Sequence, residues 1–86
     1  MAYRIKLTDE AMRVLPELTG NVRQRIRRLI GALAAEPRPV GAKELRGLPG
    51  IFRQRLARWR VIYRVVDEER LVIVLSVRAI IVGPSA

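Results

Sequence analysis

The chain has 86 residues, of which 17 are Lys or Arg and 8 are Asp or Glu, giving a formal net charge of +9. A chain of this length can bury one small hydrophobic core but not two, so we expect residues 1–86 to form a single domain. Cysteine and histidine are both absent. Their absence excludes disulfides, thiolate metal sites and catalysis by a histidine acid or base.

Most of the positive charge is carried by arginine, because Lys6 and Lys43 are the only lysines among the 17 basic residues. Such a composition can reflect nothing more than a genome-wide or thermophilic preference for arginine. The planar guanidinium also binds phosphate through two parallel hydrogen bonds. A strong basic excess in a small domain is typical of nucleic-acid-binding proteins. The charge therefore favours a polyanionic partner, either a nucleic acid or an acidic protein.

Several classes of site are not indicated by the sequence. The N-terminus lacks a signal-peptide pattern, and the longest apolar stretch, 71–82, contains Arg78 and is too short to cross a bilayer. No carboxylate cluster suited to Mg²⁺ and no glycine-rich phosphate loop is present. We therefore expect no membrane association, no metal and no cofactor. The lack of cysteine is compatible with a reducing cytoplasm.

The first half of the chain predicts one strand and two helices. Apolar residues alternate over 2–7, which indicates a strand. Thr8 is a suitable helix N-cap before two acidic residues, and Pro16 should end that helix. A second helix over 22–33 has apolar residues at i, i+4, i+7, i+8 and i+11, and Pro37 stops it.

The second half predicts three strands. Residues 40–50 contain three glycines and a proline and are expected to form a connecting segment. Strands follow at 51–56, 60–66 and 70–77, which are rich in β-branched and aromatic residues. The acidic run 67–69 separates the last two strands as a turn.

Strict alternation divides the last strand into two largely apolar faces. Leu71, Ile73, Leu75 and Val77 would face one way, and Val72, Val74, Ser76 and Arg78 the other. A strand that is apolar on both faces is expected to be central or covered on both sides.

Four arginines of the two preceding strands are predicted to share one face of the sheet. Alternation places Arg53 and Arg55 on the face opposite Phe52, Gln54 and Leu56. It likewise places Arg60 and Arg64 opposite Val61, Tyr63 and Val65. If the apolar faces meet one core, all four guanidiniums lie in one small patch. Neighbouring like charges destabilise a sheet, so a polyanion is the expected partner of this patch.

The element order β-α-α-β-β-β indicates an α+β domain. Its two helices would pack on one face of a small, mostly antiparallel sheet. The other face would stay open and carry the arginines.

Short sequence pieces in this order resemble the RelE/ParE superfamily of bacterial and archaeal toxins. They are Ala-Tyr-Arg-Ile at 2–5, Ala-Ala-Glu-Pro at 34–37, Lys-Glu-Leu-Arg-Gly at 43–47, Phe-Arg-Gln-Arg-Leu at 52–56 and Trp-Arg-Val-Ile-Tyr at 59–63. The resemblance covers about residues 1–77. It implies a RelE-like fold and, for the RelE branch, a ribosome-dependent mRNA endoribonuclease that inhibits translation in the cytoplasm. It also implies a small acidic antitoxin that binds and neutralises the toxin.

The resemblance also implies roles for individual residues. Arg53 and Arg55 match basic residues of the family's catalytic surface, and Arg60 matches its transition-state-stabilising arginine. The residues expected to contact nucleic acid are Lys43 and Arg46 in the basic loop, Arg64, and Arg78. Cleavage would proceed by attack of the RNA 2′-hydroxyl without a metal.

The chain departs from the family pattern at its C-terminal end. Active RelE-like proteins continue the last strand with a basic pair and then a tyrosine, whereas this chain has Ala79, Ile80 and Ala86 in a divergent tail, 79–86. Ala57 also stands where many members have a hairpin glycine. An attenuated toxin is therefore one interpretation. A ParE-type inhibitor of DNA gyrase and a catalytically inactive partner-binding module remain open as alternatives.

Overall fold

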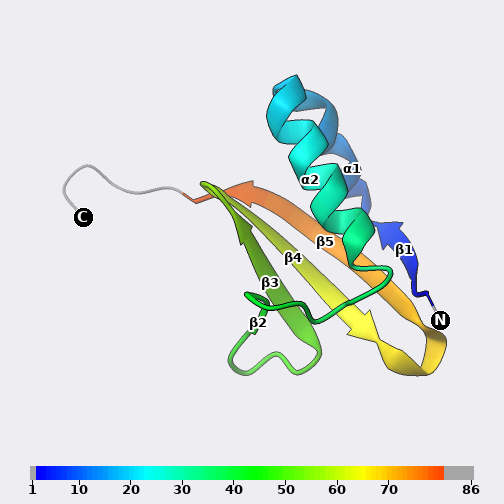
Figure 1. Cartoon of the computed structure of the whole chain (residues 1–86). Helices are drawn as coiled ribbons and strands as arrows, with labels where there is room; N and C mark the ends of the chain where they lie inside the picture. Colours follow the sequence, from blue (N-terminus) through cyan, green and yellow to red (C-terminus); the bar gives the residue numbers. More distant parts are fainter. Residues whose placement is uncertain (1, 81–86) are drawn as a thin grey trace.

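The computed structural model describes residues 2–80, which form two helices and a five-stranded sheet. The elements are β1 (Arg4–Leu7), α1 (Asp9–Val14), η1 (Leu15–Glu17), α2 (Gly20–Ala32), β2 (Lys43–Glu44), β3 (Ile51–Leu56), β4 (Trp59–Val66), η2 (Asp67–Glu69) and β5 (Leu71–Ala79). Both helices lie over the same face of the sheet (Figure 1). The predicted α+β class and the placement of the helices are confirmed.

The sheet has the strand order β1-β5-β4-β3-β2. Only the β1–β5 pair is parallel, and the other three pairs are antiparallel. The central position of β5 agrees with its two apolar faces. The sequence predicted four strands, but β2 adds a fifth at the edge, within the segment 40–50 that was expected only to connect. A two-residue strand has no measurable periodicity, so pattern reasoning could not find it.

The helix boundaries follow local chemistry. Thr8 caps α1 as expected: its Oγ1 accepts a hydrogen bond from the Ala11 N–H (3.2 Å), and its hydroxyl donates to the Leu75 carbonyl (2.7 Å). Pro16 interrupts the helix, and the chain continues as the 3₁₀ turn η1. Within residues 2–80, no helix has the length and apolar character that a membrane crossing requires.

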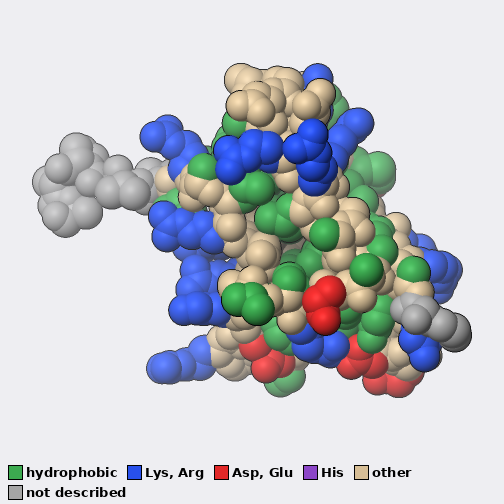
Figure 2. Space-filling model, in the orientation of Figure 1, with side chains coloured by type: hydrophobic (Ala, Val, Ile, Leu, Met, Phe, Trp, Pro, Cys, Tyr) green, Lys and Arg blue, Asp and Glu red, His purple; other side chains and the backbone are tan. Residues whose placement is uncertain are grey.

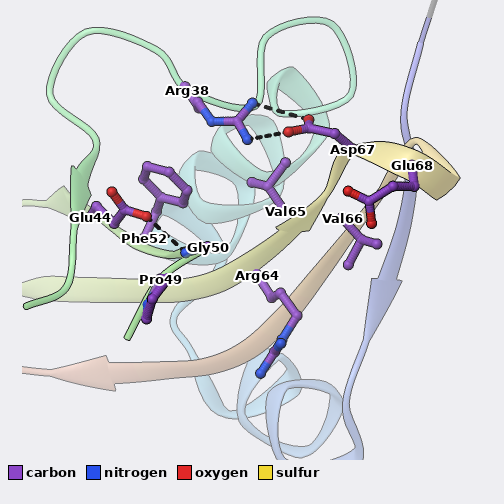
Figure 3. Close-up of a pocket in the computed structure, with 10 residues that line it drawn as sticks. All are labelled: Arg38, Glu44, Pro49, Gly50, Phe52, Arg64, Val65, Val66, Asp67 and Glu68. Carbon is purple, nitrogen blue, oxygen red and sulfur yellow. Dashed lines mark hydrogen bonds and ion pairs between the residues drawn. The ribbon is translucent and has the colours of Figure 1, made fainter. Parts of the chain in front are cut away.

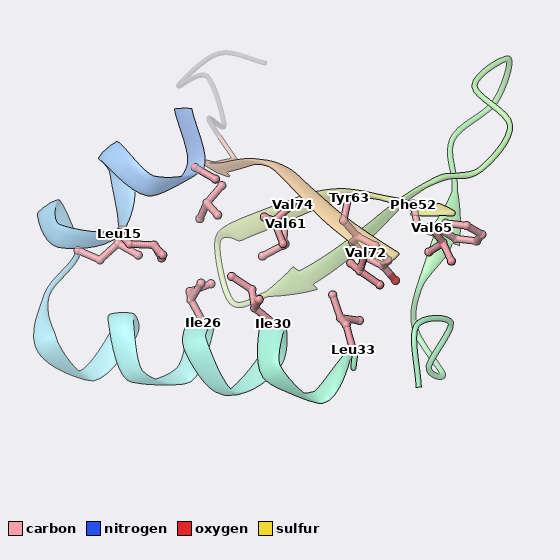
Figure 4. Packing of buried hydrophobic residues seen from close by; sticks show 13 residues of the cluster. Leu15, Ile26, Ile30, Leu33, Phe52, Val61, Tyr63, Val65, Val72 and Val74 are labelled. Carbon is pink, nitrogen blue, oxygen red and sulfur yellow. The ribbon is translucent and has the colours of Figure 1, made fainter. Parts of the chain in front are cut away.

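The core lies between the helices and the covered face of the sheet (Figure 4). Ile26 and Ile30 of α2, and Leu33 directly after it, pack with buried valines of β4 and β5. Tyr63 is fully buried, stacks on Phe52 with ring centroids 5.9 Å apart, and donates a hydrogen bond to the Pro37 carbonyl (2.8 Å). Burial raises the pKa of Tyr63 to about 12. Tyr63 therefore fastens the segment after α2 to the middle of the sheet.

A second fastening, the Arg38–Asp67 clasp, joins the same segment to the turn after β4 (Figure 3). The Arg38 guanidinium donates to both carboxylate oxygens of Asp67, at 2.6 and 3.2 Å, and lies 5.4 Å from the centre of the Phe52 ring. The Tyr3 hydroxyl donates to the same carboxylate at 2.6 Å. Hydrogen bonds from Arg38 and then Tyr3 hold the pKa of Asp67 below its ordinary 3.8.

The β3–β4 hairpin closes at the Leu56–Trp59 pair, which leaves only Ala57 and Arg58 in the turn. Ala57 has a φ of 53°. This left-handed conformation suits glycine and costs an alanine roughly 1–2 kcal/mol. The alanine at position 57, where many family members have glycine, therefore strains the backbone of the turn.

Ala57→Gly should stabilise the protein. Relief of the left-handed strain, less the extra entropy of an unfolded glycine, leaves a gain of about 0.5–1 kcal/mol, or roughly 3–6 °C in Tm for a domain of this size. Thermal unfolding followed by circular dichroism measures the change. The same exchange at Ala32, the last residue of α2, should lower Tm, because glycine weakens helices. An unchanged or lower Tm for Ala57→Gly would contradict the strain.

Asp67→Asn should destabilise the protein at neutral pH but not in strong acid. The folded-state pKa of Asp67 lies below the unfolded value, so its stabilising contribution is fully present above pH 3.8 and is lost as pH falls through the lower folded pKa. The Tm difference between wild type and variant should therefore be largest near pH 7 and shrink below pH 3.8. Glu69→Gln is the control, because Glu69 makes no ion pair within the described chain. If the Tm difference between wild type and Asp67→Asn stayed the same in strong acid, the ionised Asp67 carboxylate would not be its cause.

Candidate nucleic-acid interface

The sheet face turned away from the helices carries the predicted arginines. Arg55 lies directly opposite Arg60 across the β3–β4 pair, and Arg53 lies opposite Ile62. Because paired residues share a face, these side chains lie opposite the buried Phe52–Tyr63 pair. The register confirms the grouping of Arg53, Arg55, Arg60 and Arg64 on one face.

We call this surface the basic face. The strand registers place these basic residues on it: Arg4, Lys6, Lys43, Arg53, Arg55, Arg60, Arg64 and Arg78. Glu44 is the only acidic residue in a described strand, and it pairs with Phe52 on the covered face. Figure 2 shows Lys and Arg side chains gathered along the left of the view, where Figure 1 places the β3–β4 hairpin and, below it, the edge strand β2. The strands thus present cations without neighbouring strand carboxylates.

One hollow in the basic face lies near the edge strand β2. Lys43 pairs with Arg53, and these two residues with Arg55 and Gly41 line a cavity of about 220 Å³. Lys43 and Arg55 are exposed, whereas Arg53 is half-buried. Three cations around one small hollow form a site where an anion would be stabilised.

The predicted faces of β5 are wrong beyond Val74, because the strand contains a β-bulge. Ile62 pairs with Ser76 while the next residue, Tyr63, pairs with Val74, so Leu75 is left as the extra residue. A bulge shifts the alternation by one position. Strict alternation put Arg78 on the face of Val72 and Val74, but the structure pairs it with Arg60 on the basic face.

A second hollow follows from this shift. Its volume is about 460 Å³, and its lining residues are Arg60, Ile62, Ser76, Arg78, Ala79 and Ile80. The Nε of Arg60 is buried there without a hydrogen-bond partner among the described residues. A buried donor without an acceptor is costly, and the guanidinium that carries it belongs to a residue lining this hollow, where the charges of Arg60 and Arg78 would stabilise an anion.

The structure separates Lys43 from Arg46, which the sequence analysis assigned together. Lys43 lies in β2 on the basic face, whereas Arg46 is exposed in the loop beyond that edge strand. The Gly50 N–H donates to the Glu44 carboxylate at 2.8 Å and closes this loop. Arg64 is exposed at the same end of the sheet, where it pairs with Ile51, and it points away from the Arg38–Asp67 clasp (Figure 3).

A carboxylate that the sequence analysis did not single out lies beside Arg78. Glu10, in the first turn of α1, accepts from the Arg78 Nε at 3.2 Å and from its terminal nitrogen at 3.0 Å. The two residues are 68 positions apart, so no local sequence rule could have paired them. Among residues 2–80 no group of three or more acidic, histidine or cysteine side chains is arranged to hold a metal ion.

The family departures lie at the end of β5 and just beyond it. Ala79 is exposed, and Ile80 is half-buried in the lining of the second hollow. Neither side chain carries a titratable group. Ala86, where the resemblance expects a tyrosine, lies outside the described residues.

Two curated relatives match most of the chain. The mRNA interferase toxin RelE of Escherichia coli is 30% identical over 79 residues, which cover 90% of this chain and 82% of the relative. Toxin RelG of Mycobacterium tuberculosis is 33% identical over 78 residues and covers 90% of each chain.

Solved structures agree with these sequence matches. The isolated E. coli RelE toxin superposes with a TM-score of 0.86 at 27% identity and covers 98% of this chain and 90% of its own. An archaeal RelE–RelB complex from Pyrococcus horikoshii gives a TM-score of 0.83 at 26% identity, over 93% of this chain and 97% of that one. Both contain the same fold as this protein.

The sequence family described as "ParE toxin of type II toxin-antitoxin system, parDE" matches residues 4–79, which span all five strands and both helices. The family match, the two relatives and the shared fold agree with the resemblance carried by the short sequence pieces. The chain belongs to the RelE/ParE family of toxins of type II toxin–antitoxin systems.

Proposed function

We propose that this chain is a toxin that cleaves mRNA on the translating ribosome and thereby inhibits translation. The observation that carries the proposal is the basic face, where the strand registers gather cations without an opposing strand carboxylate. A relative at 30% identity is named an mRNA interferase toxin, which supports RNA as the polyanion. The substrate is then the phosphodiester backbone of a single-stranded message.

The chemistry that suits this face is attack by the RNA's own 2′-hydroxyl. The 2′-oxygen loses its proton and forms a bond to the adjacent phosphorus while the bond to the 5′-oxygen breaks. The 5′-oxygen takes up a proton from water or a ribosomal group, which leaves a 2′,3′-cyclic phosphate and a 5′-hydroxyl. Extra negative charge develops on the phosphate oxygens in the transition state. Arg60, flanked by Arg55 across the strand pair, would stabilise that charge, since preorganised cations act most strongly where charge develops.

The remaining cations have binding roles in this proposal. Arg53 and Lys43 share the smaller hollow and would hold the message beside the reacting phosphate, with Arg53 also on the catalytic surface. Arg46 and Arg64 would contact the backbone at the end of the face away from the hairpin, and Arg78 would contact it beside Arg60. Contacts of this type fix the position of the RNA rather than read its sequence.

Proton transfer is the part of the reaction to which the chain contributes least. Histidine and cysteine are absent, and Tyr63 is on the covered face with its pKa raised to about 12 by burial. Arginine keeps its proton and is a poor base. The proton of the 2′-hydroxyl would therefore leave to water or to a ribosomal group. Orientation of the message by the ribosome would supply much of the rate.

An acidic antitoxin is the partner that the charge favours. A net charge of +9 in 86 residues would attract an acidic protein and speed its association. Related toxins have been crystallised together with RelB antitoxins. The proposed place of action is the cytoplasm, where translating ribosomes and a co-expressed antitoxin would both be available.

Arg60→Ala should reduce mRNA cleavage on translating ribosomes by about 100-fold, because one preorganised charge-stabilising group is lost. Primer extension on a translated message measures the cleavage. Arg27→Ala is the matched control: Arg27 is an exposed arginine of α2, on the helix side of the sheet. Both variants should unfold at temperatures close to that of wild type.

Equal cleavage by the Arg27 and Arg60 variants would reject the basic face as the active surface. A wild-type protein that leaves translated mRNA intact but blocks DNA supercoiling would move the function to the gyrase-inhibitor alternative. If the wild-type protein has neither activity, the catalytically inactive partner-binding module is the remaining interpretation.

Binding to an uncleavable single-stranded RNA should weaken steeply with salt. Each neutralised phosphate contributes about −0.7 to the slope of log affinity against log salt. Four contacts, made by Arg53, Arg55, Arg60 and Arg64, would give a slope near −3, and each further phosphate contact, such as that of Arg78, would add about −0.7. Fluorescence anisotropy with a 2′-O-methyl oligonucleotide measures it between roughly 50 and 200 mM salt. An affinity independent of salt would rule out a phosphate-binding surface.

A further inference from the structure

Arg55, Arg60 and Arg78 form one row across three strands. Arg55 pairs with Arg60 in the β3–β4 ladder, and Arg60 pairs with Arg78 in the β4–β5 ladder. The bulge at Leu75 is what brings Arg78 into this row. Three like charges at directly paired cross-strand positions destabilise the free protein, so the row is arranged for an anion rather than for stability.

Glu10 partly neutralises the row at one end. Strand β1 stops at Leu7, and the Thr8 N–H donates to the Val74 carbonyl (3.0 Å), which leaves the edge of β5 beyond this point unpaired by β1. The first turn of α1 follows there and sets the Glu10 carboxylate against the Arg78 guanidinium, at 3.0 and 3.2 Å. The side chains of Arg78 and Glu10 are 71% and 48% exposed, so the pair can separate without opening the core.

The hollow beside this pair is lined by two arginines and no carboxylate. Arg60 and Arg78 both line it, and the Arg60 Nε is buried with no partner among the described residues. Glu10 is not part of the lining. An anion that enters the hollow would be attracted by the Arg60 guanidinium and would come within reach of the Arg78 side chain.

We propose that Arg78 exchanges Glu10 for an RNA phosphate when the message binds beside Arg60. Arg78 then supplies a cation at the end of the last strand, where Ala79 and Ile80 carry none. Glu10 holds the guanidinium at the rim of the hollow in the free protein and lowers RNA affinity by competing for it. The inference rests on the proposed RNA-cleaving function and adds a residue and a form of control to the same site.

The competition is expected to be modest. An ion pair as exposed as Arg78–Glu10 changes an equilibrium by at most about fivefold, whereas a guanidinium–phosphate contact is charge-assisted and often bidentate. RNA should therefore displace Glu10, and Glu10 should tune affinity rather than block binding.

The test uses the full chain and a 2′-O-methyl single-stranded RNA, with anisotropy read across a salt series. Glu10→Gln should tighten binding about two- to fivefold and leave the salt slope near the wild-type value, because Arg78 contacts phosphate in both proteins. Arg78→Ala should weaken binding and make the slope shallower by about 0.7. The gain from Glu10→Gln should shrink when Arg78 is already alanine.

Asp9→Asn is the matched control. Asp9 precedes Glu10 in the same first turn of α1 and makes no ion pair within the described chain. The control removes the same charge at nearly the same place. If Asp9→Asn tightened RNA binding as much as Glu10→Gln, the effect would be general electrostatics and the exchange would be refuted. An unchanged salt slope for Arg78→Ala would also refute it.

Cleavage on ribosomes separates this inference from the proposed function. If Arg60→Ala loses cleavage and Arg78→Ala cleaves as fast as wild type, the exchange is overturned and the proposed function stands. No effect of either variant would overturn the proposed function itself. Reduced cleavage in both, with faster cleavage for Glu10→Gln at low RNA concentration, is the result expected from the exchange.

Discussion

The helices cover only one face of the sheet, and this one-sided packing is the constraint on which the other features depend. Every second residue of β3 and β4 is released from the core and can be charged, while its neighbours must be apolar. Tyr63 and Val61 are fully buried on the covered face, and Arg60 and Arg64 alternate with them on the other. The same eight-residue strand therefore supports both the core and the basic face.

The two ends of the sheet are stabilised by different means. At one end, Tyr63 and the Arg38–Asp67 clasp fix the chain after α2 by hydrogen bonds and charge. At the other end lie the strained turn at Ala57 and the cross-strand arginines. Like charges and a left-handed alanine both oppose folding. The interactions at the first end and in the shared core must offset the unfavourable free energy of the hairpin end. The proposed chemistry takes place at the hairpin end.

Periodicity predicted the parts of this fold where alternation is unbroken. The helix near 22–33 and the arginine grouping on 51–56 and 60–66 follow from residue spacing alone, because burial selects apolar residues at regular intervals. The bulge at Leu75 breaks that rule inside a strand that is apolar on both faces, so nothing in the residue pattern marked it. The contact of Glu10 with Arg78 depends on where β1 ends relative to β5, which is a tertiary property.

The chemistry left to this chain is electrostatic. The last strand ends at Ala79 and is followed by Ile80, so this part of the chain offers charge stabilisation by Arg78 but no side chain suited to moving a proton. A charge-stabilising group typically lowers the activation free energy by about 2.7–4 kcal/mol, which is about 100- to 1,000-fold in rate. Holding the reacting groups in line can lower it by about 7–11 kcal/mol. In the proposed reaction, most of the rate enhancement therefore comes from whatever orients the message. The proposed preference for translated mRNA follows from that dependence, because free RNA would meet the same cations without the orientation.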